Sequence, residues 1–332
     1  MKTLLLNKDE VGELIDLDKI QEAVEDGYRA FNSGQTVIPD FMSVVKPGTH
    51  EGVDFKSGMD LQSGYMLIKA SSGGYDKNPE IGLPTGMNTV MLFDANTSAL
   101  LAVMDGTWIT GCRTGAAGAI SVKYLSRKDS SVLCVIGAGN QARRQLRAIS
   151  RVRDFKEVRV WNIFPEELET YVKEMKEELG LNIIACETPE EAVKGADVIV
   201  TVTRGLEKVI QRDWIRPGTH ITCIGADMPY KQEMFADVFK GAKIVNDNRL
   251  LCAKNGETHH AIEEGVIKAE DVYGEIGEII LGNKPGREND EEITIFDTVG
   301  MAIQDIAMSG MLYKAAMAKG TGTFYEFFPD NI

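Results

Sequence analysis

The spacing of hydrophobic positions changes along the chain and predicts two kinds of structure. Before Ser130, an amphipathic helix within residues 14–35 ends at Gly34, a predicted glycine C-cap. Strands are expected at residues 65–71 and on both sides of a turn at residues 94–99. A helix of small residues suited to close packing is expected at residues 114–126. This first part is therefore predicted to mix helices and strands.

From Ser130 onward, short apolar strands alternate with amphipathic helices. The strands are expected at residues 131–137, 157–162, 182–186, 197–203, 220–227, 243–247 and 293–297. Nearly continuous apolar strands with helices between them predict a parallel sheet that is covered on both faces. This part of the chain is therefore predicted to be one α/β domain.

The C-terminal residues return to a helical pattern at residues 306–320, followed by an aromatic tail. A helix that folds back onto the first part of the chain makes the first domain discontinuous. We therefore expect an α+β domain of residues 1–125 plus 303–332 and an α/β domain of residues 126–302. The fold class is α/β.

Composition and charge narrow the classes of partner. The net charge of −14 over 332 residues argues against a nucleic-acid partner, which needs clustered Lys and Arg. No apolar run approaches the roughly 20 residues of a membrane span, and the N-terminal apolar stretch is too short for a signal peptide. The five cysteines lack metal or disulfide spacing and are typical of reduced core residues. We expect a cytoplasmic protein without a membrane partner.

Residues 137–142 form the pattern G-x-G-x-x-A between a predicted strand and a predicted helix. Gly137 permits a tight turn, Gly139 lets the backbone approach a pyrophosphate, and Ala142 lets the helix lie close to the strand. The helix N-terminus offers free N–H groups to the phosphates. With Asn140 and Gln141 inside it, this turn predicts a dinucleotide site, because its strand–turn–helix context matches the motif.

The residue expected to read the adenosine ribose is Asn162, which lies 20 residues after Ala142. An amide bonds ribose hydroxyls but brings no charge. Glu166 and Glu167 follow it and would repel a 2′-phosphate, which favours NAD over NADP. Arg143 or Arg144 would reverse that preference by reaching across from the turn.

Five blocks of the sequence, in order, resemble the ornithine cyclodeaminase/μ-crystallin family of NAD(P)-dependent enzymes. They are residues 82–94, 100–125, 135–142, 218–234 and 293–305. The resemblance covers essentially the whole chain. It implies a Rossmann domain, a substrate and dimerisation domain completed by the C-terminal helix, and a homodimer. Members include ornithine cyclodeaminases, alanine dehydrogenases and imine reductases.

The resemblance gives roles to three charged residues that have ordinary explanations otherwise. Lys69 ends an apolar strand and would bind the substrate carboxylate, although an edge-strand Lys in solvent is the alternative. Arg113 lies among small residues and would also hold the carboxylate beside the nicotinamide, although it is equally a helix N-terminal Arg paired with a surface acid. Asp227 follows a strand and would act as the acid/base group, although a turn Asp before Pro229 is common.

The remaining residues are carried over from the family by position. The predicted cofactor contacts are Thr85, Arg113, Thr114, Thr203, Lys231 and Thr298, besides the glycine turn and Asn162. The predicted substrate contacts are Met59 and Val299, besides Lys69 and Arg113.

Hydride transfer from the α-carbon of an amino acid gives an iminium, and the family uses it in three ways. Water attacks it in an amino-acid dehydrogenase, a second amine attacks it in a cyclodeaminase, and an imine reductase runs the step backwards. Ornithine cyclodeaminases carry an Arg and a Glu at positions that we align with Phe41 and Ser57. Because this chain has neither the Arg nor the Glu, the sequence favours a dehydrogenase or imine reductase of a small amino acid over a cyclodeaminase. Lys56 and Asp60 lie nearby as alternative readers of the substrate side chain.

Two other functions are compatible with parts of the sequence. His50, His259 and His260 suggest a metal, but neighbouring histidines on a helix point to different faces, and no site is expected. A cofactor-dependent small-ligand-binding protein of μ-crystallin type is the non-enzymatic alternative. Retention of Lys69, Arg113 and Asp227 together favours an enzyme.

Overall fold

The computed structural model describes residues 2–327 and divides the chain into two compact units. The first comprises residues 1–113 with 301–332, and the second comprises residues 114–300. Each has its own sheet and its own buried apolar core. Within the described residues, no helix combines the length and the apolar character that crossing a bilayer requires.

The sheet of the first unit is mostly antiparallel. Its strands run in the order β16-β1-β7-β6-β5-β4-β2, and β3 pairs with β4. The strands are β1 (Thr3–Leu6), β2 (Thr36–Val37), β3 (Met42–Val45), β4 (Gly52–Asp60), β5 (Tyr65–Gly73), β6 (Asn88–Asp94), β7 (Leu100–Asp105) and β16 (Thr323–Tyr325). Only the β1–β7 pair is parallel among the pairings described.

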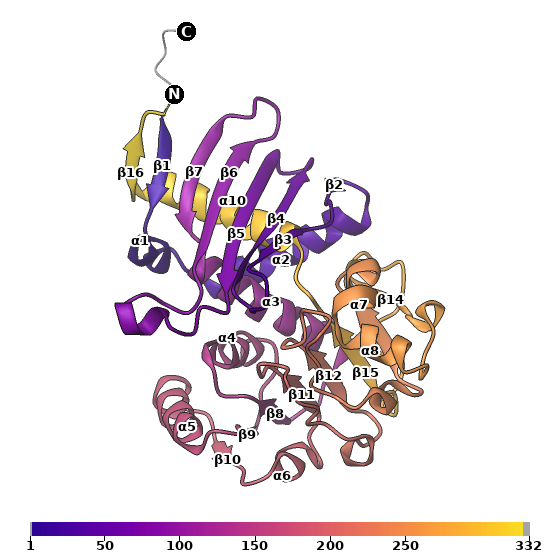
Figure 1. The fold of residues 1–332 in the computed structure, drawn as a ribbon. Helices are drawn as coiled ribbons and strands as arrows, with labels where there is room; N and C mark the ends of the chain where they lie inside the picture. Colours follow the sequence, from indigo (N-terminus) through magenta and orange to yellow (C-terminus); the bar gives the residue numbers. More distant parts are fainter. Residues whose placement is uncertain (1, 328–332) are drawn as a thin grey trace. The chain divides into compact units, whose positions relative to one another are not determined.

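Helices cover one face of this sheet. They are α1 (Lys8–Glu13), α2 (Leu17–Asn32) and the C-terminal α10 (Ala302–Lys319). Figure 1 shows the yellow α10 beside the indigo α2, and α10 also packs on β4, β5 and β6. Gly58 permits this approach, because a Cβ there would lie 2.6 Å from Ile38 and 3.2 Å from Ala302. The C-terminal segment is thus part of the N-terminal unit.

The second unit is a parallel sheet with the strand order β10-β9-β8-β11-β12-β15-β13-β14. Its strands are β8 (Val132–Ile136), β9 (Glu157–Trp161), β10 (Ile183–Ala185), β11 (Val198–Thr201), β12 (His220–Cys223), β13 (Lys243–Asn246), β14 (Gly274–Glu275) and β15 (Thr294–Asp297). The first five follow the Rossmann order, which reverses between β8 and β11. Ligands of such sheets bind outside the carboxyl ends of the strands at this reversal.

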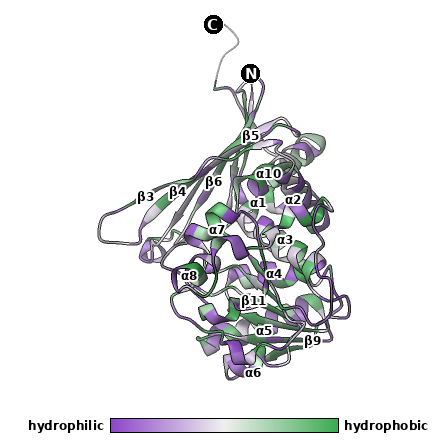
Figure 2. Ribbon diagram, turned by 90° about the vertical axis from the view of Figure 1, so that its right-hand side faces the viewer, coloured by the Kyte–Doolittle hydropathy of each residue, from purple (hydrophilic) through white to green (hydrophobic). Residues whose placement is uncertain are grey.

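Helices flank the parallel sheet on both faces. They are α4 (Asn140–Ile149), α5 (Pro165–Leu179), α6 (Pro189–Val193), α7 (Arg249–Asn255), α8 (Glu257–Glu263) and α9 (Ile276–Ile280). Separate clusters of buried apolar side chains lie on the two faces. Figure 2 shows strands such as β9 and β11 largely green, whereas the helices carry both colours. The predicted doubly covered parallel sheet is confirmed.

Helix α3 (Thr107–Leu125) is longer than predicted and crosses the division between the units. The chain passes from the first unit to the second between residues 113 and 114, instead of the predicted 125 and 126. It passes back to the first unit between residues 300 and 301, instead of 302 and 303. The reason is that the second half of α3 packs on α4. A Cβ at Gly115 would lie 2.8 Å from the Arg144 carbonyl oxygen, and Gln145 Nε2 donates to the Thr114 carbonyl over 2.9 Å.

Candidate functional site

The glycine turn after β8 has the geometry that the sequence predicted. Gly137 has φ +119°, and a Cβ on it would lie 2.7 Å from the Val202 carbonyl oxygen, so only glycine fits. Gly139 is the N-cap of α4 with nothing within 4 Å of a Cβ position. Ala142 is fully buried on the sheet. The turn therefore holds α4 against β8 and leaves open space above Gly139.

A cavity of about 450 Å³ opens beside this turn, within the second unit. Its walls come from the carboxyl ends of three strands: Gly137 to Gln141 after β8, Trp161 to Phe164 and Glu167 after β9, and Val202 to Glu207 with Val209 after β11. This is the position at which parallel sheets of this order bind dinucleotides. The residues fit the group, because the N-terminus of α4 begins at Gly139 beside open space and attracts phosphate.

Asn162 lines this cavity, but its amide is occupied within the protein. Nδ2 donates to the Phe164 carbonyl oxygen over 3.1 Å and to Glu167 Oε2 over 3.1 Å. The amide therefore holds the Glu167 carboxylate in place, and only Oδ1 remains for a ribose hydroxyl. Arg143 is also occupied, because its guanidinium pairs with Glu174 and donates to the Ala138 carbonyl oxygen.

Asp227 lies in the loop after β12 and forms an ion pair there. Lys231 Nζ donates to Asp227 Oδ1 over 2.6 Å. Burial by itself would lower the pKa of Lys231, but the Asp227 carboxylate outweighs burial and raises that pKa. Lys231 therefore stays charged beside the Asp227 carboxylate. The Asp227 side chain is half-exposed.

Sequence reasoning missed Glu233, a buried carboxylate that ties two loops together. Its oxygens accept the Thr203 N–H over 2.5 Å and the Gly225 N–H over 2.9 Å. Burial raises the pKa of Glu233. Thr203 follows β11 and Gly225 precedes Asp227, so one side chain positions both loops at the carboxyl ends of β11 and β12. In the sequence, Glu233 is a Glu six residues after Asp227, and the hydrophobic pattern around it does not distinguish a buried Glu from a surface one.

The loop after β15 is held in the same way by Asp247. The Thr298 hydroxyl donates to Asp247 Oδ2 over 2.5 Å, and the Gly300 N–H donates to the same oxygen over 2.9 Å. Thr298 and Val299 are buried. The Thr298 side chain is thus engaged by a carboxylate, and the cofactor contact predicted for it remains a prediction.

In the first unit, Lys69 points to the helix-covered face of the sheet and meets Asp305 of α10. Lys69 is 1% exposed and Asp305 is 0% exposed, and Nζ lies 2.8 Å from Oδ1. Burial lowers the pKa of Lys69 to about 7, and the nearby cations Arg113 and Lys56 act in the same direction. The Asp305 carboxylate raises this pKa but does not outweigh them. The alternative that Lys69 is an edge-strand lysine in solvent is therefore wrong. Asp305 itself was missed, since the sequence does not show what faces Lys69.

Arg113 joins the same cluster. Its Nε lies 3.2 Å from Asp305 Oδ1, and Nη1 donates to Gln304 Oε1 over 2.8 Å. Gln304 in turn donates to the Tyr28 hydroxyl over 2.5 Å. Arg113 sits in the seventh position of α3, not at its N-terminus, so the surface-paired N-terminal Arg is wrong as well. Two buried cations thus converge on one carboxylate.

The register of β4 and β5 decides which neighbouring side chains share the face of Lys69. Lys56 pairs directly with Lys69, so both lie on the α10 side. Met59 pairs with Met66 and Ser57 pairs with Ile68, so both lie on the opposite face. The β4 side chain beside Lys69 is thus a cation, Lys56, and Ser57 lies on the other face. The alignment of Ser57 with the cyclodeaminase Glu remains a prediction. The predicted substrate contact of Met59 gains no support from this placement.

Two further predicted cofactor contacts lie outside these clusters. Thr85 is exposed in the segment between β5 and β6, where its carbonyl oxygen accepts the Tyr75 N–H over 3.3 Å. Thr114 begins the half of α3 that belongs to the second unit, and its carbonyl accepts from Gln145. Their cofactor contacts remain predictions.

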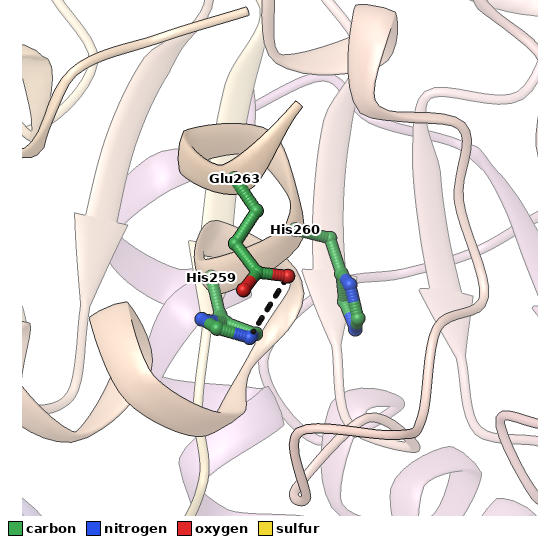
Figure 3. Close-up of side chains that lie close together, drawn as sticks. All are labelled: His259, His260 and Glu263. Atoms are coloured by element: carbon green, nitrogen blue, oxygen red, sulfur yellow. Dashed lines mark ion pairs between the residues drawn. The ribbon is translucent and has the colours of Figure 1, made fainter. Parts of the chain in front are cut away.

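His259, His260 and Glu263 of α8 lie closer together than their spacing suggested (Figure 3). One ligand atom of each lies within 4.8 Å of the others, and His259 Nε2 is 3.3 Å from Glu263 Oε2. The argument that the histidines point apart overlooked Glu263, four residues after His259. The second nitrogen of each ring is held by a carbonyl oxygen: Ala253 for His259 and Lys231 for His260. These bonds and the ion pair account for the arrangement.

Comparison with known proteins identifies the family. The model of the ornithine cyclodeaminase/mu-crystallin family matches residues 1–320. The chain belongs to this family. An alanine dehydrogenase of Archaeoglobus fulgidus is 40% identical over 334 residues, covering 99% of each chain. A solved archaeal alanine dehydrogenase dimer with bound NAD has a TM-score of 0.93 at 40% identity, covering 99% of this chain and 100% of that one.

Two solved reductases are similar over the same length. The Δ1-pyrroline-2-carboxylate reductase of Thermococcus litoralis, in complex with NADH and L-proline, has a TM-score of 0.92 at 33% identity, covering 97% of this chain and 99% of that one. The iminosuccinate reductase of Paracoccus denitrificans, in complex with NAD⁺, has a TM-score of 0.92 at 31% identity, covering 98% and 100%. The predicted family, α/β fold and amino-acid or imine oxidoreductase class are confirmed.

Proposed function

We propose that this chain uses NAD(H) to interconvert a small α-amino acid and its imine or 2-oxo acid. The observation that carries the proposal is the pair of buried cations, Lys69 and Arg113, around the single carboxylate of Asp305. With Lys56 on the same face, positive charge exceeds negative charge in this cluster. A substrate carboxylate balances that excess.

Each group has a role that follows from its surroundings. Lys69 and Arg113 hold the carboxylate, and carboxylate binding restores the pKa of Lys69 toward its ordinary value by adding negative charge. Asp227, paired with Lys231, accepts the amine proton and stabilises the iminium that forms. The nicotinamide, when bound, accepts or donates the hydride. Glu233 keeps Thr203 and the Asp227 loop in place.

An activity panel tests this function. We expect NADH formation from at least one of alanine, proline and aspartate, or NADH consumption with the matching imine or oxo acid plus ammonia. Turnover of none of them, with NADH binding intact by nicotinamide fluorescence, would favour the μ-crystallin type of binding protein instead. Faster conversion of ornithine or lysine to a cyclic amino acid would show a cyclodeaminase.

We predict that Lys56 excludes diamino acids. A distal ammonium group beside Lys69 would meet the like charge of Lys56, which is paired with Lys69 across β4 and β5. Lys56→Ala should therefore raise kcat/KM for ornithine by roughly tenfold or more, since juxtaposed like charges cost several kcal/mol. Ser57→Ala, on the opposite face of the same strand, is the control and should leave that value unchanged. Equal ornithine kinetics in wild type and Lys56→Ala would contradict the prediction.

We also propose a homodimer formed through the open face of the first sheet. This face carries half-buried apolar side chains, namely Phe55, Met59, Met66, Ile68, Met91, Phe93 and Val103. An apolar face of this extent needs cover. Light scattering should give a dimer at micromolar concentration and a monomer for Ile68→Lys with Met91→Lys. Ile184→Lys, on β10 of the second unit, should remain dimeric. A monomeric wild type would refute the proposal.

A further inference from the structure

Glu167 places a carboxylate in the wall of the dinucleotide cavity. It lies in the first turn of α5, after Pro165, and its Oε2 accepts the Asn162 amide over 3.1 Å. The neighbouring Glu166 does not line this cavity, whereas Glu167 and Asn162 both do. Asn162 is thus a positioning residue, and Glu167 is the charged group that it presents.

The chemistry of this position is that of ribose recognition. An NAD site of this fold has a carboxylate after the second strand, which accepts the ribose hydroxyls. Here the second strand is β9, and it ends in an amide instead of an acid. The carboxylate comes from the first turn of α5, five residues later. The two residues together supply what one Asp or Glu supplies in the usual pattern.

The cationic side chains nearby do not neutralise a 2′-phosphate at this point. Arg143 is bound to Glu174 and to the Ala138 carbonyl oxygen. Among the lining residues of the described chain, Arg204 is the single cation, and it comes from the loop after β11, not from the β9 end. A phosphate beside Glu167 would therefore meet like charge without compensation.

We propose that Glu167, held by Asn162, accepts the hydroxyls of the adenosine ribose and selects NAD(H) over NADP(H). The proposal rests on the proposed function, because it concerns the same cofactor site. It moves the ribose contact from Asn162, where the sequence placed it, to Glu167 of the following helix. It also assigns to Glu167 the repulsion of a 2′-phosphate that the sequence attributed to Glu166 and Glu167 together.

Fluorescence titration of the full-length protein with NADH and NADPH tests it. Wild type should bind NADH more tightly. Glu167→Gln keeps an oxygen for the Asn162 amide but removes the charge, so it should weaken NADH binding by roughly tenfold, the usual worth of a hydrogen bond to a charged group. NADPH binding should hold or improve, so the preference for NADH should fall by more than tenfold. Asn162→Ala should shift the preference in the same direction, by less.

Glu166→Gln is the matched control, since it makes the same change of charge one residue away and outside the cavity wall. Unchanged NADH affinity in Glu167→Gln, or an equal loss in Glu166→Gln, would overturn the assignment while leaving the proposed function standing. A wild type that prefers NADPH and loses that preference in Arg204→Gln would also overturn it. A wild type that binds neither nucleotide would overturn the proposed function itself.

Discussion

Asp227→Asn is expected to lower kcat by roughly a hundredfold or more on the best substrate of the panel, the usual worth of a positioned acid/base group. The amide keeps the size and one hydrogen-bond acceptor of Asp227, but it takes no proton and carries no charge to balance the iminium. NADH affinity should stay close to wild type, because Asp227 does not line the dinucleotide cavity. Steady-state kinetics with fluorescence titration measure both quantities.

Two comparisons separate this role from a structural one. Asp237→Asn makes the same change at an exposed position of the same unit and should leave kcat unaltered. Lys69→Ala should raise KM as well as lower kcat, since carboxylate binding is present in both the ground state and the transition state. A variant Asp227→Asn with near-full kcat would reduce Asp227 to a turn residue and refute the mechanism.

The second sheet was predictable because burial on both faces leaves a plain record in the sequence. Its strands are apolar at almost every position, and the glycine turn after β8 fixes the strand–helix order. The first sheet was predicted only in part. Strand β4 carries Asp54, Lys56 and Asp60 at alternate positions, on the face that also carries Lys69. A charged face turned toward covering helices is the reverse of the usual strand pattern. Strand β16 pairs with β1 across the whole chain length, and no local pattern reports such a partner.

The chemistry of the candidate site was predictable by residue type, but its partners were not. Lys69 and Arg113 were found through the family blocks, whereas the carboxylate between them, Asp305, lies more than 190 residues away in sequence and looks like an ordinary first-turn acid. Glu233 was missed for the same reason. Buried charges must be compensated, so each predicted cation implied an acid that the sequence alone did not locate.

Strand register is the second feature of the candidate site that could not be predicted from the sequence. The alignment near Met59 is gapped, and a shift of one residue moves a side chain to the other face of a sheet. The register places Lys56, not Ser57, beside Lys69, so the face of Lys69 carries a further cation. Repulsion by this cation is a second reason, besides the loss of an acid, to expect poor turnover of ornithine.

Gly139→Val should abolish tight cofactor binding without unfolding the protein. Gly139 has φ −77°, which valine adopts without strain, and the space around its Cβ position is empty for 4 Å. That space is where the backbone of the α4 N-terminus must approach the pyrophosphate. We therefore expect a loss of NADH affinity of roughly a hundredfold or more, equivalent to about 3 kcal/mol. The melting temperature should change little.

Gly137→Val is a useful comparison with Gly139→Val, because it should lose NADH binding for a different reason. At φ +119° and 2.7 Å from the Val202 carbonyl oxygen, a side chain at residue 137 strains the turn and displaces β11. It should lower the melting temperature clearly, and its loss of NADH binding would follow from the damaged fold. Gly139→Ala should fall between wild type and Gly139→Val in affinity, since a methyl group obstructs less than an isopropyl group. Full NADH affinity in a folded Gly139→Val protein would place the cofactor elsewhere, because no phosphate close to this backbone tolerates a branched side chain there.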